Sequence, residues 1–242
     1  MKVVILAGGF GTRLSELTGN IPKPMAQIGD LPIIIHIMNN YAAHGHKDFI
    51  IALGYKAEVI KNYFANLSLI KSDYTVNLNS GEIKIHKKSN MDWNVTLVDT
   101  GIDTMTGGRI KRLKNFIGKN DFLLTYGDGV SNVDIPSTIK LHKDSSKLLT
   151  MTVVRPTARF GEIEIEGDIV KSFEEKPQLH QGWINGGFFV CNSNVLNFID
   201  GDKEMFEREP LQKIIKIGGL GAYKHHGFWH CMDSKRDHEK LN

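Results

Sequence analysis

The sequence predicts an α/β fold, in which a mainly parallel β-sheet is flanked by helices and a smaller antiparallel portion lies in the second half. Short apolar runs of strand length alternate with segments of helical periodicity through the first half, as in chains built from β-α units with right-handed crossovers. In the second half, two alternating segments at 160–166 and 169–174 flank the turn Gly167-Asp168, which is typical of an antiparallel hairpin. Because the 242 residues contain no repeat, low-complexity stretch or linker, we expect one continuous domain over 1–242.

The elements expected in the first half begin with a buried strand at 3–7, which stops at two glycines. A turn at 29–32 then precedes a helix over 33–44. Pro32 suits the start of this helix, because its missing N–H costs nothing there, and Gly45 ends it. The remaining strands are expected at 48–53, 95–98, 121–126 and 148–154, and the remaining helices around 59–64, at 106–117 and at 135–142.

The segment 67–94 interrupts this alternation of strands and helices. Strands at 74–76 and 82–86 flank Asn79-Ser80-Gly81, which predicts a hairpin. Beyond the second hairpin, a strand is expected within 183–191, helices at 195–199 and 206–217, and short closing strands at 220–224 and 228–232. Asp233 then begins the last segment.

Composition excludes several classes of function. A net charge of +3, from 30 basic and 27 acidic residues, argues against nucleic-acid binding by electrostatics, but it permits a few basic residues aimed at a small polyanion. Cys191 and Cys231 are too few for a disulfide framework, which favours a cytoplasmic enzyme with free thiols. No apolar stretch approaches the ~20 residues of a membrane span, and the first apolar run is too short for a signal peptide. We therefore expect no nucleic-acid partner, no membrane partner and a cytoplasmic location.

A glycine loop follows the first strand and reads Gly8-Gly9-Phe10-Gly11-Thr12-Arg13. Its bare backbone N–H groups lie at the carboxyl edge of the sheet, where open α/β sheets bind ligands, and its glycines allow close approach to a phosphate. Ten residues later, Lys23 stands between two prolines, a stiff setting that suits an ammonium aimed at a fixed phosphate. The loop lacks the Gly-Lys-Ser/Thr of a Walker loop, and Leu14 stands where the dinucleotide pattern requires glycine. We interpret it as a triphosphate site; the alternatives are a tight turn and a surface lysine.

Two acidic residues, Asp128 and Asp233, each follow a short apolar run. Asp128 is bracketed by glycines at the expected sheet edge, where a carboxylate can bind the Mg²⁺ that phosphoryl chemistry needs. Its alternative role is to stabilise a turn. From spacing alone, the favoured role of Asp233 is the N-cap of a final helix, and metal binding is its second role.

Polar residues in the second half suit a sugar phosphate. Lys176 could reach the phosphate and Glu175 could accept hydrogen bonds from hydroxyls, although both could equally form a charged turn. Asn185 adjoins two glycines, and its amide both donates and accepts. The segment 225–231 (H-H-G-F-W-H-C) is disfavoured as a zinc site, because adjacent histidines on a strand point to opposite faces and no second ligand pair accompanies them.

As a set, these motifs resemble the signature of the sugar-1-phosphate nucleotidylyltransferases, over essentially the whole chain. The resemblance is carried by the loop from Gly8 to Leu14 with Pro22-Lys23-Pro24-Met25, and by Asp128, Glu175-Lys176-Pro177, Asn185-Gly186-Gly187 and Asp233 in the family's order and approximate spacing. Within the family, the chain is most similar to members that transfer a cytidylyl group to glucose 1-phosphate. The stretches 93–101, 105–109, 125–130 and 185–190 carry that similarity.

The resemblance implies a reaction between CTP and α-D-glucose 1-phosphate that gives CDP-glucose and pyrophosphate, by Mg²⁺-assisted in-line attack on the α-phosphorus. The segments 154–160 and 178–182 depart from the family pattern on the sugar side. Another phosphorylated acceptor for polysaccharide biosynthesis, or another nucleoside triphosphate, is therefore an alternative. A catalytically silent subunit that binds nucleotide sugars is an alternative of a different class.

The resemblance also implies a role for each motif residue. Arg13 would hold the β- and γ-phosphates, and Arg109 would read a cytosine carbonyl. The implied catalytic residues are Arg13 and Lys23; the nucleotide-binding residues are Gly8, Gly9, Gly11, Thr12, Arg13, Thr106 and Arg109; the sugar-phosphate-binding residues are Gly161, Glu175, Lys176 and Asn185; and the Mg²⁺ ligands are Asp128 and Asp233. The implied fold is Rossmann-like, with a nucleotide-binding part at about 1–130 and a sugar-phosphate-binding part at about 131–242. A homo-oligomer is left open.

Overall fold

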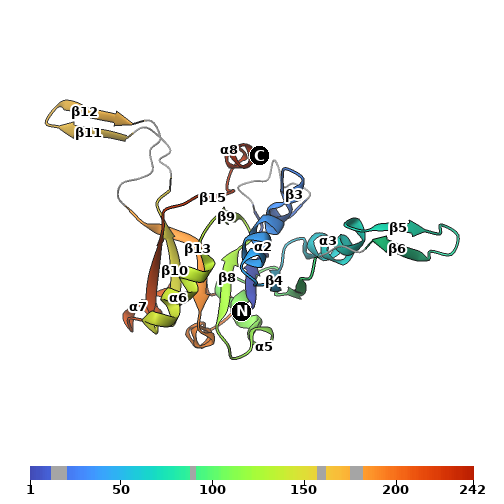
Figure 1. Cartoon of the computed structure of the whole chain (residues 1–242). Coiled ribbons are helices and arrows are strands. Elements are labelled where there is room, and N and C mark those ends of the chain that lie inside the picture. The colour runs from blue at the N-terminus through green and yellow to red at the C-terminus, as the bar shows by residue number, and fades with distance from the viewer. Residues whose placement is uncertain (12–20, 88–90, 157–161, 175–181) are drawn as a thin grey trace.

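A computed structural model of the chain describes residues 1–11, 21–87, 91–156, 162–174 and 182–242 (Figure 1). Its central sheet has seven strands: β1 (Val3–Leu6), β4 (Asp48–Leu53), β7 (Asn94–Asp99), β8 (Phe122–Tyr126), β10 (Leu149–Val154), β13 (Ile184–Cys191) and β14 (Leu220–His225). Their order is β14-β10-β13-β8-β1-β4-β7. All neighbours run parallel except β13, which is antiparallel to both β8 and β10. The expected mixed, mainly parallel α/β fold is confirmed.

Strand β1 lies in the interior of the sheet, between β8 and β4, and is apolar throughout, because both faces of the sheet are covered. Val3 and Ile5 enter the core on one face, and Val4 and Leu6 enter the core on the other. In register, β1 pairs with β4 on one side and with β8 on the other. The carboxyl ends of these three parallel strands therefore meet at one edge, where their loops gather.

Helices cover both faces of the sheet. They are α2 (Ile33–Ala43), α3 (Ala57–Ile70), α4 (Thr106–Arg112), α5 (Lys114–Ile117), α6 (Ile135–Ser145), α7 (Glu209–Lys216) and α8 (Lys235–Leu241). Helices α2 and α3 pack into the core on one face, whereas α4, α5 and α7 pack into the core on the other. Among the described residues, no helix has both the length and the apolar character that crossing a bilayer requires.

Several elements differ locally from the sequence-based expectation. The helix expected at 106–117 is divided into α4 and α5 at Leu113, which is fully buried at the break. The turn expected at 29–32 contains a short antiparallel pair, β2 (Gln27–Ile28) with β3 (Leu31–Pro32). The segment 195–199 lies mostly in a 3-10 helix, η3 (Ser193–Phe198). Helix α7 begins at Glu209 rather than near 206, because Pro210 has no N–H and suits a first turn.

The cap of the last helix also differs from the expectation. Ser234 caps α8, since its hydroxyl accepts a hydrogen bond from the N–H of Asp237, and the Asp237 carboxylate accepts from the N–H of Ser234 in return. The expectation that Asp233 caps this helix is therefore wrong. One residue earlier in the chain, Asp233 is free to direct its carboxylate elsewhere.

Two antiparallel hairpins extend from opposite sides of the body (Figure 1). One pairs β5 (Asp73–Val76) with β6 (Ile83–Lys87), and the other pairs β11 (Glu162–Glu166) with β12 (Ile169–Glu174). Both hairpins were expected from the sequence and are confirmed. A further antiparallel pair joins β9 (Gly129–Ser131), which was not expected, to β15 (Trp229–Cys231).

Candidate active site

A cavity of about 490 Å³ opens at the carboxyl edge of the sheet. The loop at 8–11 forms one wall, directly after β1, and Gly11 takes the left-handed φ of 63° that glycine tolerates. The described residues that were expected to bind nucleotide or metal all line this cavity: Gly8, Gly9, Gly11, Lys23, Thr106, Arg109, Asp128 and Asp233. The structure thus brings together motifs that lie up to 225 positions apart in the sequence (233 minus 8).

Lys23 lies between the two expected metal ligands. It begins a short 3-10 helix, η2 (Lys23–Met25), and its Nζ lies 2.8 Å from the Asp128 carboxylate and 2.6 Å from that of Asp233. The Lys23 side chain is only 12% exposed. Burial acts to lower the pKa of Lys23, but the charge of Asp128 and the hydrogen bonds to both carboxylates outweigh it, so the pKa is raised. The ammonium is therefore charged at neutral pH.

The two aspartates meet because two distant strands pair. Asp128 follows β8 and leads into β9, and β15, which pairs with β9, ends two residues before Asp233. The N–H of Met232 donates a 2.9 Å hydrogen bond to the carbonyl of Asp128, which fixes this approach. Gly127 is needed here, because a Cβ at that position would lie 3.0 Å from both the carbonyl oxygen of Leu6 and the ring of Pro24.

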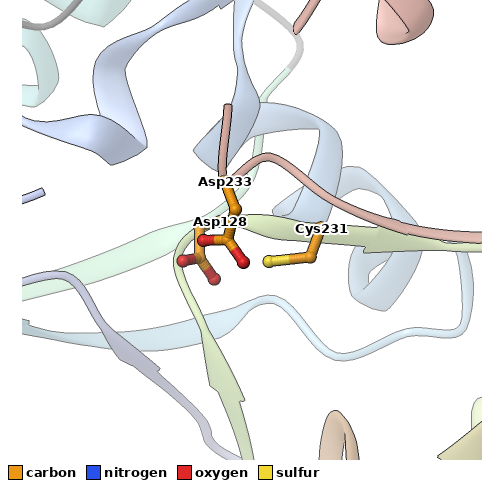
Figure 2. Close-up of side chains that lie close together, drawn as sticks. All are labelled: Asp128, Cys231 and Asp233. Atoms are coloured by element: carbon orange, nitrogen blue, oxygen red, sulfur yellow. The ribbon is translucent and has the colours of Figure 1, made fainter. Parts of the chain in front are cut away.

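The site also contains Cys231. Ligand atoms of Asp128, Asp233 and Cys231 all lie within 4.8 Å of one another (Figure 2). Burial, reinforced by the two carboxylates, raises the pKa of the Cys231 thiol, so the thiol is neutral at physiological pH. From the sequence, Cys231 was expected to be a free thiol and was weighed with the neighbouring histidines, but it was not placed in the site. The two-residue spacing from Cys231 to Asp233 could have indicated its position, because such a spacing can bring two side chains to one side of an extended segment.

Arg109 lines the cavity but directs its guanidinium into the protein, where the residue is only 4% exposed. Burial lowers the pKa of Arg109, although an arginine stays protonated at any physiological pH. Its two terminal nitrogens donate to the carbonyls of Gly8 (2.9 Å), Leu53 (2.9 Å), Gly101 (2.8 Å) and Ile102 (3.2 Å) and to the hydroxyl of Thr100 (2.8 Å).

The guanidinium of Arg109 thereby ties together the loops that follow β1, β4 and β7. The contact with a cytosine carbonyl that was expected for Arg109 stays a prediction. The guanidinium lies so close to two glycines that a Cβ at Gly8 would come within 2.2 Å of it, and a Cβ at Gly54 within 2.4 Å. Gly8 is therefore required for packing against Arg109.

A hydrogen-bonded chain runs from Thr106, which was expected to bind the nucleotide, to Asn185, which was expected to bind the sugar phosphate. The hydroxyl of Thr106 donates to Glu207 at 2.6 Å, and the hydroxyl of Tyr126 donates to the other oxygen of the same carboxylate at 2.5 Å. The amide of Asn185 donates to the Tyr126 oxygen at 3.4 Å, and its own oxygen accepts from the N–H of Gly187 at 2.8 Å. Burial and the Glu207 carboxylate raise the pKa of Tyr126, which stays protonated. Neither Tyr126 nor Glu207 was assigned a role from the sequence. Tyr126 lies in the stretch 125–130 that carries the family similarity, where only Asp128 was chosen, and Glu207 lies in no recognised motif.

The structure places the remaining candidates as follows. Thr12, Arg13, Gly161, Glu175 and Lys176 lie outside the described residues. His225 is buried, and its Nε2 lies 3.1 Å from the carbonyl oxygen of Phe228 and 3.2 Å from the hydroxyl of Ser131. The ring of His226 packs edge-on against Trp183.

Comparison with known proteins identifies the family. A family model described as "Nucleotidyl transferase" matches residues 2–219. The chain belongs to the nucleotidyl transferase family. This confirms the family expected from the sequence motifs and makes the chain a nucleotidyltransferase.

Individual relatives of this nucleotidyl transferase match along nearly their whole length. The chain is 51% identical over 238 residues to a glucose-1-phosphate cytidylyltransferase of Salmonella typhi, with 98% of this chain and 93% of the relative covered. A probable glucose-1-phosphate cytidylyltransferase of Bacillus subtilis is 41% identical over 243 residues, with 100% of this chain and 95% of the relative covered. Among solved structures, HddC from Yersinia pseudotuberculosis complexed with GMP-PN superposes with a TM-score of 0.71 at 26% identity, over 99% of this chain and 97% of that one.

The geometry suits the chemistry of a nucleotidyl transferase. Phosphoryl chemistry of this kind depends on positioning and on neutralising charge, more than on a covalent intermediate with the enzyme. The cavity offers backbone N–H groups on one wall and a buried ammonium on another, with two carboxylates beside the ammonium. Both carboxylates supply the oxygen ligands that Mg²⁺ prefers, whereas a neutral thiol is a poor ligand for it.

Proposed function

We propose that this nucleotidyl transferase moves the cytidylyl group of CTP to α-D-glucose 1-phosphate and forms CDP-glucose and pyrophosphate. Support comes from the two cytidylyltransferases named above, which align with nearly the whole chain. A phosphate oxygen of the sugar 1-phosphate attacks the α-phosphorus of CTP. The bond from that phosphorus to the oxygen bridging to the β-phosphate breaks, and pyrophosphate leaves with its electron pair.

The observation that carries the proposal is the position of Lys23. Its charged ammonium lies in the same cavity as the glycine loop and within 2.8 Å of two acidic side chains. There it can neutralise the negative charge of two phosphorylated substrates, which must approach each other for the reaction to occur. A subunit that only bound nucleotide sugars would not need a cation held in this place, which argues against the non-catalytic alternative.

Mg²⁺ fits the donor set beside Lys23, because Asp128 and Asp233 converge on one cation, the lysine ammonium. We propose that these two carboxylates hold Mg²⁺ in the working enzyme. When bound, the ion would neutralise phosphate charge and polarise phosphate oxygens.

The other roles follow the family resemblance. Gly8, Gly9, Gly11 and Thr12 would hold the triphosphate through the loop, and Arg13 would bind the β- and γ-phosphates of the leaving pyrophosphate. Thr106 would lie on the nucleotide side, and Arg109, whose guanidinium donates to the carbonyl of Gly8, would help to hold the nucleotide. Residues from about 131 onward would bind the sugar phosphate, through Gly161, Glu175, Lys176 and Asn185.

A related nucleotide specificity is the second candidate. The chain is also 35% identical to a D-glycero-alpha-D-manno-heptose 1-phosphate guanylyltransferase of Campylobacter jejuni. The match covers 89% of this chain and 87% of that relative. GTP and a heptose phosphate are therefore the competing substrates to test.

We also propose a cytoplasmic location, because Cys191 and Cys231 are both free thiols, as the reducing cytosol maintains them.

Pyrophosphate release over a matrix of nucleoside triphosphates and sugar 1-phosphates tests the proposal. We expect kcat/KM to be highest with CTP and glucose 1-phosphate, by about 100-fold over CTP with an epimeric sugar phosphate, and we expect mass spectrometry to identify CDP-glucose. Removing divalent cations with EDTA should stop turnover, and adding Mg²⁺ should restore it. Absence of turnover with CTP and glucose 1-phosphate, beside turnover with another pair, would replace the proposed specificity while keeping the reaction class.

A further inference from the structure

Glu207 is a half-buried carboxylate that lies behind the wall of the active-site cavity. The described residues that line the cavity include Thr106 and Tyr126 but not Glu207. Its two oxygens accept hydrogen bonds from these two side chains, at 2.6 Å from the Thr106 hydroxyl and at 2.5 Å from the Tyr126 hydroxyl. Both distances fall in the range for a hydroxyl that donates to an ionised carboxylate. Glu207 can therefore act on a ligand in the cavity through these two hydroxyls.

The segment that carries Glu207 is fixed against the first turn of α4. The N–H of Gly107 donates a 3.0 Å hydrogen bond to the carbonyl of Glu204. Glycine permits this approach, because a Cβ at position 107 would lie 2.7 Å from the same carbonyl oxygen. The N–H of Phe206 donates to the hydroxyl oxygen of Thr106 at 2.9 Å. Backbone contacts thus hold the Glu207 carboxylate beside Thr106.

These contacts determine the hydrogen-bonding direction of the Thr106 hydroxyl. An ionised carboxylate has acceptors only, so Thr106 must direct its proton to Glu207. One lone pair of the Thr106 oxygen accepts from the N–H of Phe206, and no described residue donates to the other. Toward a ligand in the cavity, Thr106 is therefore an acceptor of hydrogen bonds and not a donor.

Thr106 lies in a part of the cavity that suits a nucleoside. It directly follows Met105, which lines the cavity together with Ile102, and these two apolar side chains are 44% and 51% exposed. The glycine loop and the Lys23 ammonium form the part of the lining that suits phosphates. A nucleoside triphosphate that directs its phosphates to that part leaves its nucleoside for the apolar part, beside Thr106.

We propose that Glu207 is a positioning residue that selects the nucleotide: by accepting the hydroxyl proton of Thr106, it makes Thr106 accept a hydrogen bond from a donor group of the nucleoside. This inference rests on the proposed function, because it supposes a nucleoside triphosphate in the cavity. The donor group is an amino group of the base or a hydroxyl of the ribose. Cytosine carries an amino group where uracil carries a carbonyl, so the first source favours CTP over UTP, since a carbonyl cannot donate to Thr106.

Calorimetric titration of the full chain with single nucleotides measures this selection without turnover. The base arm compares CTP with UTP, and the ribose arm compares CTP with its 2′-deoxy and 3′-deoxy forms. We expect the wild-type Kd to be about tenfold lower for CTP than for the analogue that lacks the donor, in one of the two arms.

Glu207→Gln reverses the direction of one hydrogen bond at nearly constant shape. Its amide oxygen accepts from Tyr126, the stronger donor, and its NH₂ group donates to Thr106. The hydroxyl proton of Thr106 is then released toward the cavity. We expect the tenfold preference to be lost, and we expect KM for the nucleotide to change more than kcat does.

Three variants separate this selection from a general loss of fit. Tyr126→Phe removes the other hydrogen bond of Glu207 but leaves Thr106 its carboxylate partner, so the wild-type preference should persist. Thr106→Val removes the acceptor and should lose the preference, and adding Glu207→Gln to it should change the ratio of Kd values no further. Glu209→Gln makes the same substitution at a side chain that is 70% exposed and should change nothing.

The outcomes distinguish this proposal from the proposed substrate. Unchanged preferences in both arms for Glu207→Gln would overturn the role of Glu207, and so would an equal loss in Tyr126→Phe. A wild-type chain that binds and turns over another nucleotide in place of CTP would overturn the proposed substrate. The role of Glu207 is then tested with that nucleotide and its analogues, for example with GTP against ITP, which lacks the amino group of guanine.

Discussion

At the scale of single residues, the site depends on one cation placed between two anions. Lys23 lies between two prolines at the start of η2, and its ammonium contacts the carboxylates of Asp128 and Asp233 at 2.8 and 2.6 Å. Because its pKa is raised above the usual 10.5, the interaction contributes fully to stability at neutral pH and is lost only at pH values above 10.5. Lys23 is thus charged wherever the enzyme can work.

Replacing Lys23 should damage turnover more than folding. In Lys23→Ala the reacting phosphates lose their neutralising ammonium, so we expect kcat to fall by about 10²–10³-fold. Steady-state kinetics measures this, with circular dichroism as a check on the fold. Lys140→Ala, an exposed lysine on α6, provides the control. A Lys23→Ala enzyme with near-wild-type kcat would exclude the proposed role.

Gly8 and Gly9 are neighbours that should respond differently to the same methyl group. Gly8→Ala places a Cβ 2.2 Å from the Arg109 guanidinium, whereas a Cβ at Gly9 meets no atom within 4 Å. We expect Gly8→Ala to lower the free energy of unfolding by about 1–3 kcal/mol and to weaken nucleotide binding, because Arg109 must move. Urea denaturation and nucleotide titration measure both effects. Equal effects from Gly8→Ala and Gly9→Ala would show that the contact with Arg109 is unimportant.

At the scale of elements, local sequence sets where the helices begin. The start of α6 is fixed by Asp134, whose carboxylate accepts hydrogen bonds from the N–H of Ser137 at 2.9 Å and from its hydroxyl at 2.7 Å. These bonds lower the pKa of Asp134 below the usual 3.8. Helix α7 likewise has a proline, Pro210, in its first turn, and α8 begins at the reciprocal bonds between Ser234 and Asp237.

Removing the Asp134 cap should destabilise the protein in a pH-dependent way. Asp134→Ala should lower the free energy of unfolding by about 1 kcal/mol at pH 7, whereas Asp134→Asn should retain most of the cap. Since the folded-state pKa is depressed, the carboxylate contributes above pH 3.8 and its contribution is lost as the pH falls below that value. Denaturation curves at pH 7 and pH 3 should therefore show a smaller difference between wild type and Asp134→Ala in acid. A difference that is constant with pH would argue against the carboxylate cap.

At the scale of the whole molecule, one sheet separates two cores and gathers the site at one edge. Phe189 on β13 is 1% exposed and packs edge-on against both Tyr126 and Phe206. It thereby supports Tyr126, which belongs to the hydrogen-bonded chain from Thr106 to Asn185. Phe189 therefore belongs to one of the two cores and also contacts a side chain that lines the site.

Truncating Phe189 should therefore cost stability and activity together. We expect Phe189→Ala to lower the free energy of unfolding by about 3–5 kcal/mol, since it removes a fully buried ring. Phe116→Ala, at a ring that is 42% exposed, should cost far less. Chemical denaturation of the two variants under identical conditions measures the contrast. Similar losses from both would mean that the core is not organised around β13.

The sequence by itself determined the α/β class, both hairpins and most strands, because the burial of a strand or helix face is recorded in local periodicity. Strand 48–53 was predicted with the bounds that the structure has. The glycine loop, Lys23 and Asp128 were also recognisable, since each belongs to a compact motif. The family followed from those motifs taken as a set and is confirmed by comparison.

Only the tertiary structure decided how the distant side chains are used. Asp233 could have capped a helix, and it contacts Lys23, 210 positions away, because β15 pairs with β9 and Ser234 already supplies the cap. Arg109 was expected on the nucleotide side, and the structure adds that its guanidinium donates to carbonyls of three loops that converge only when the sheet forms. Such roles depend on strand order and on competition among hydrogen-bond partners, and neither is encoded in local spacing.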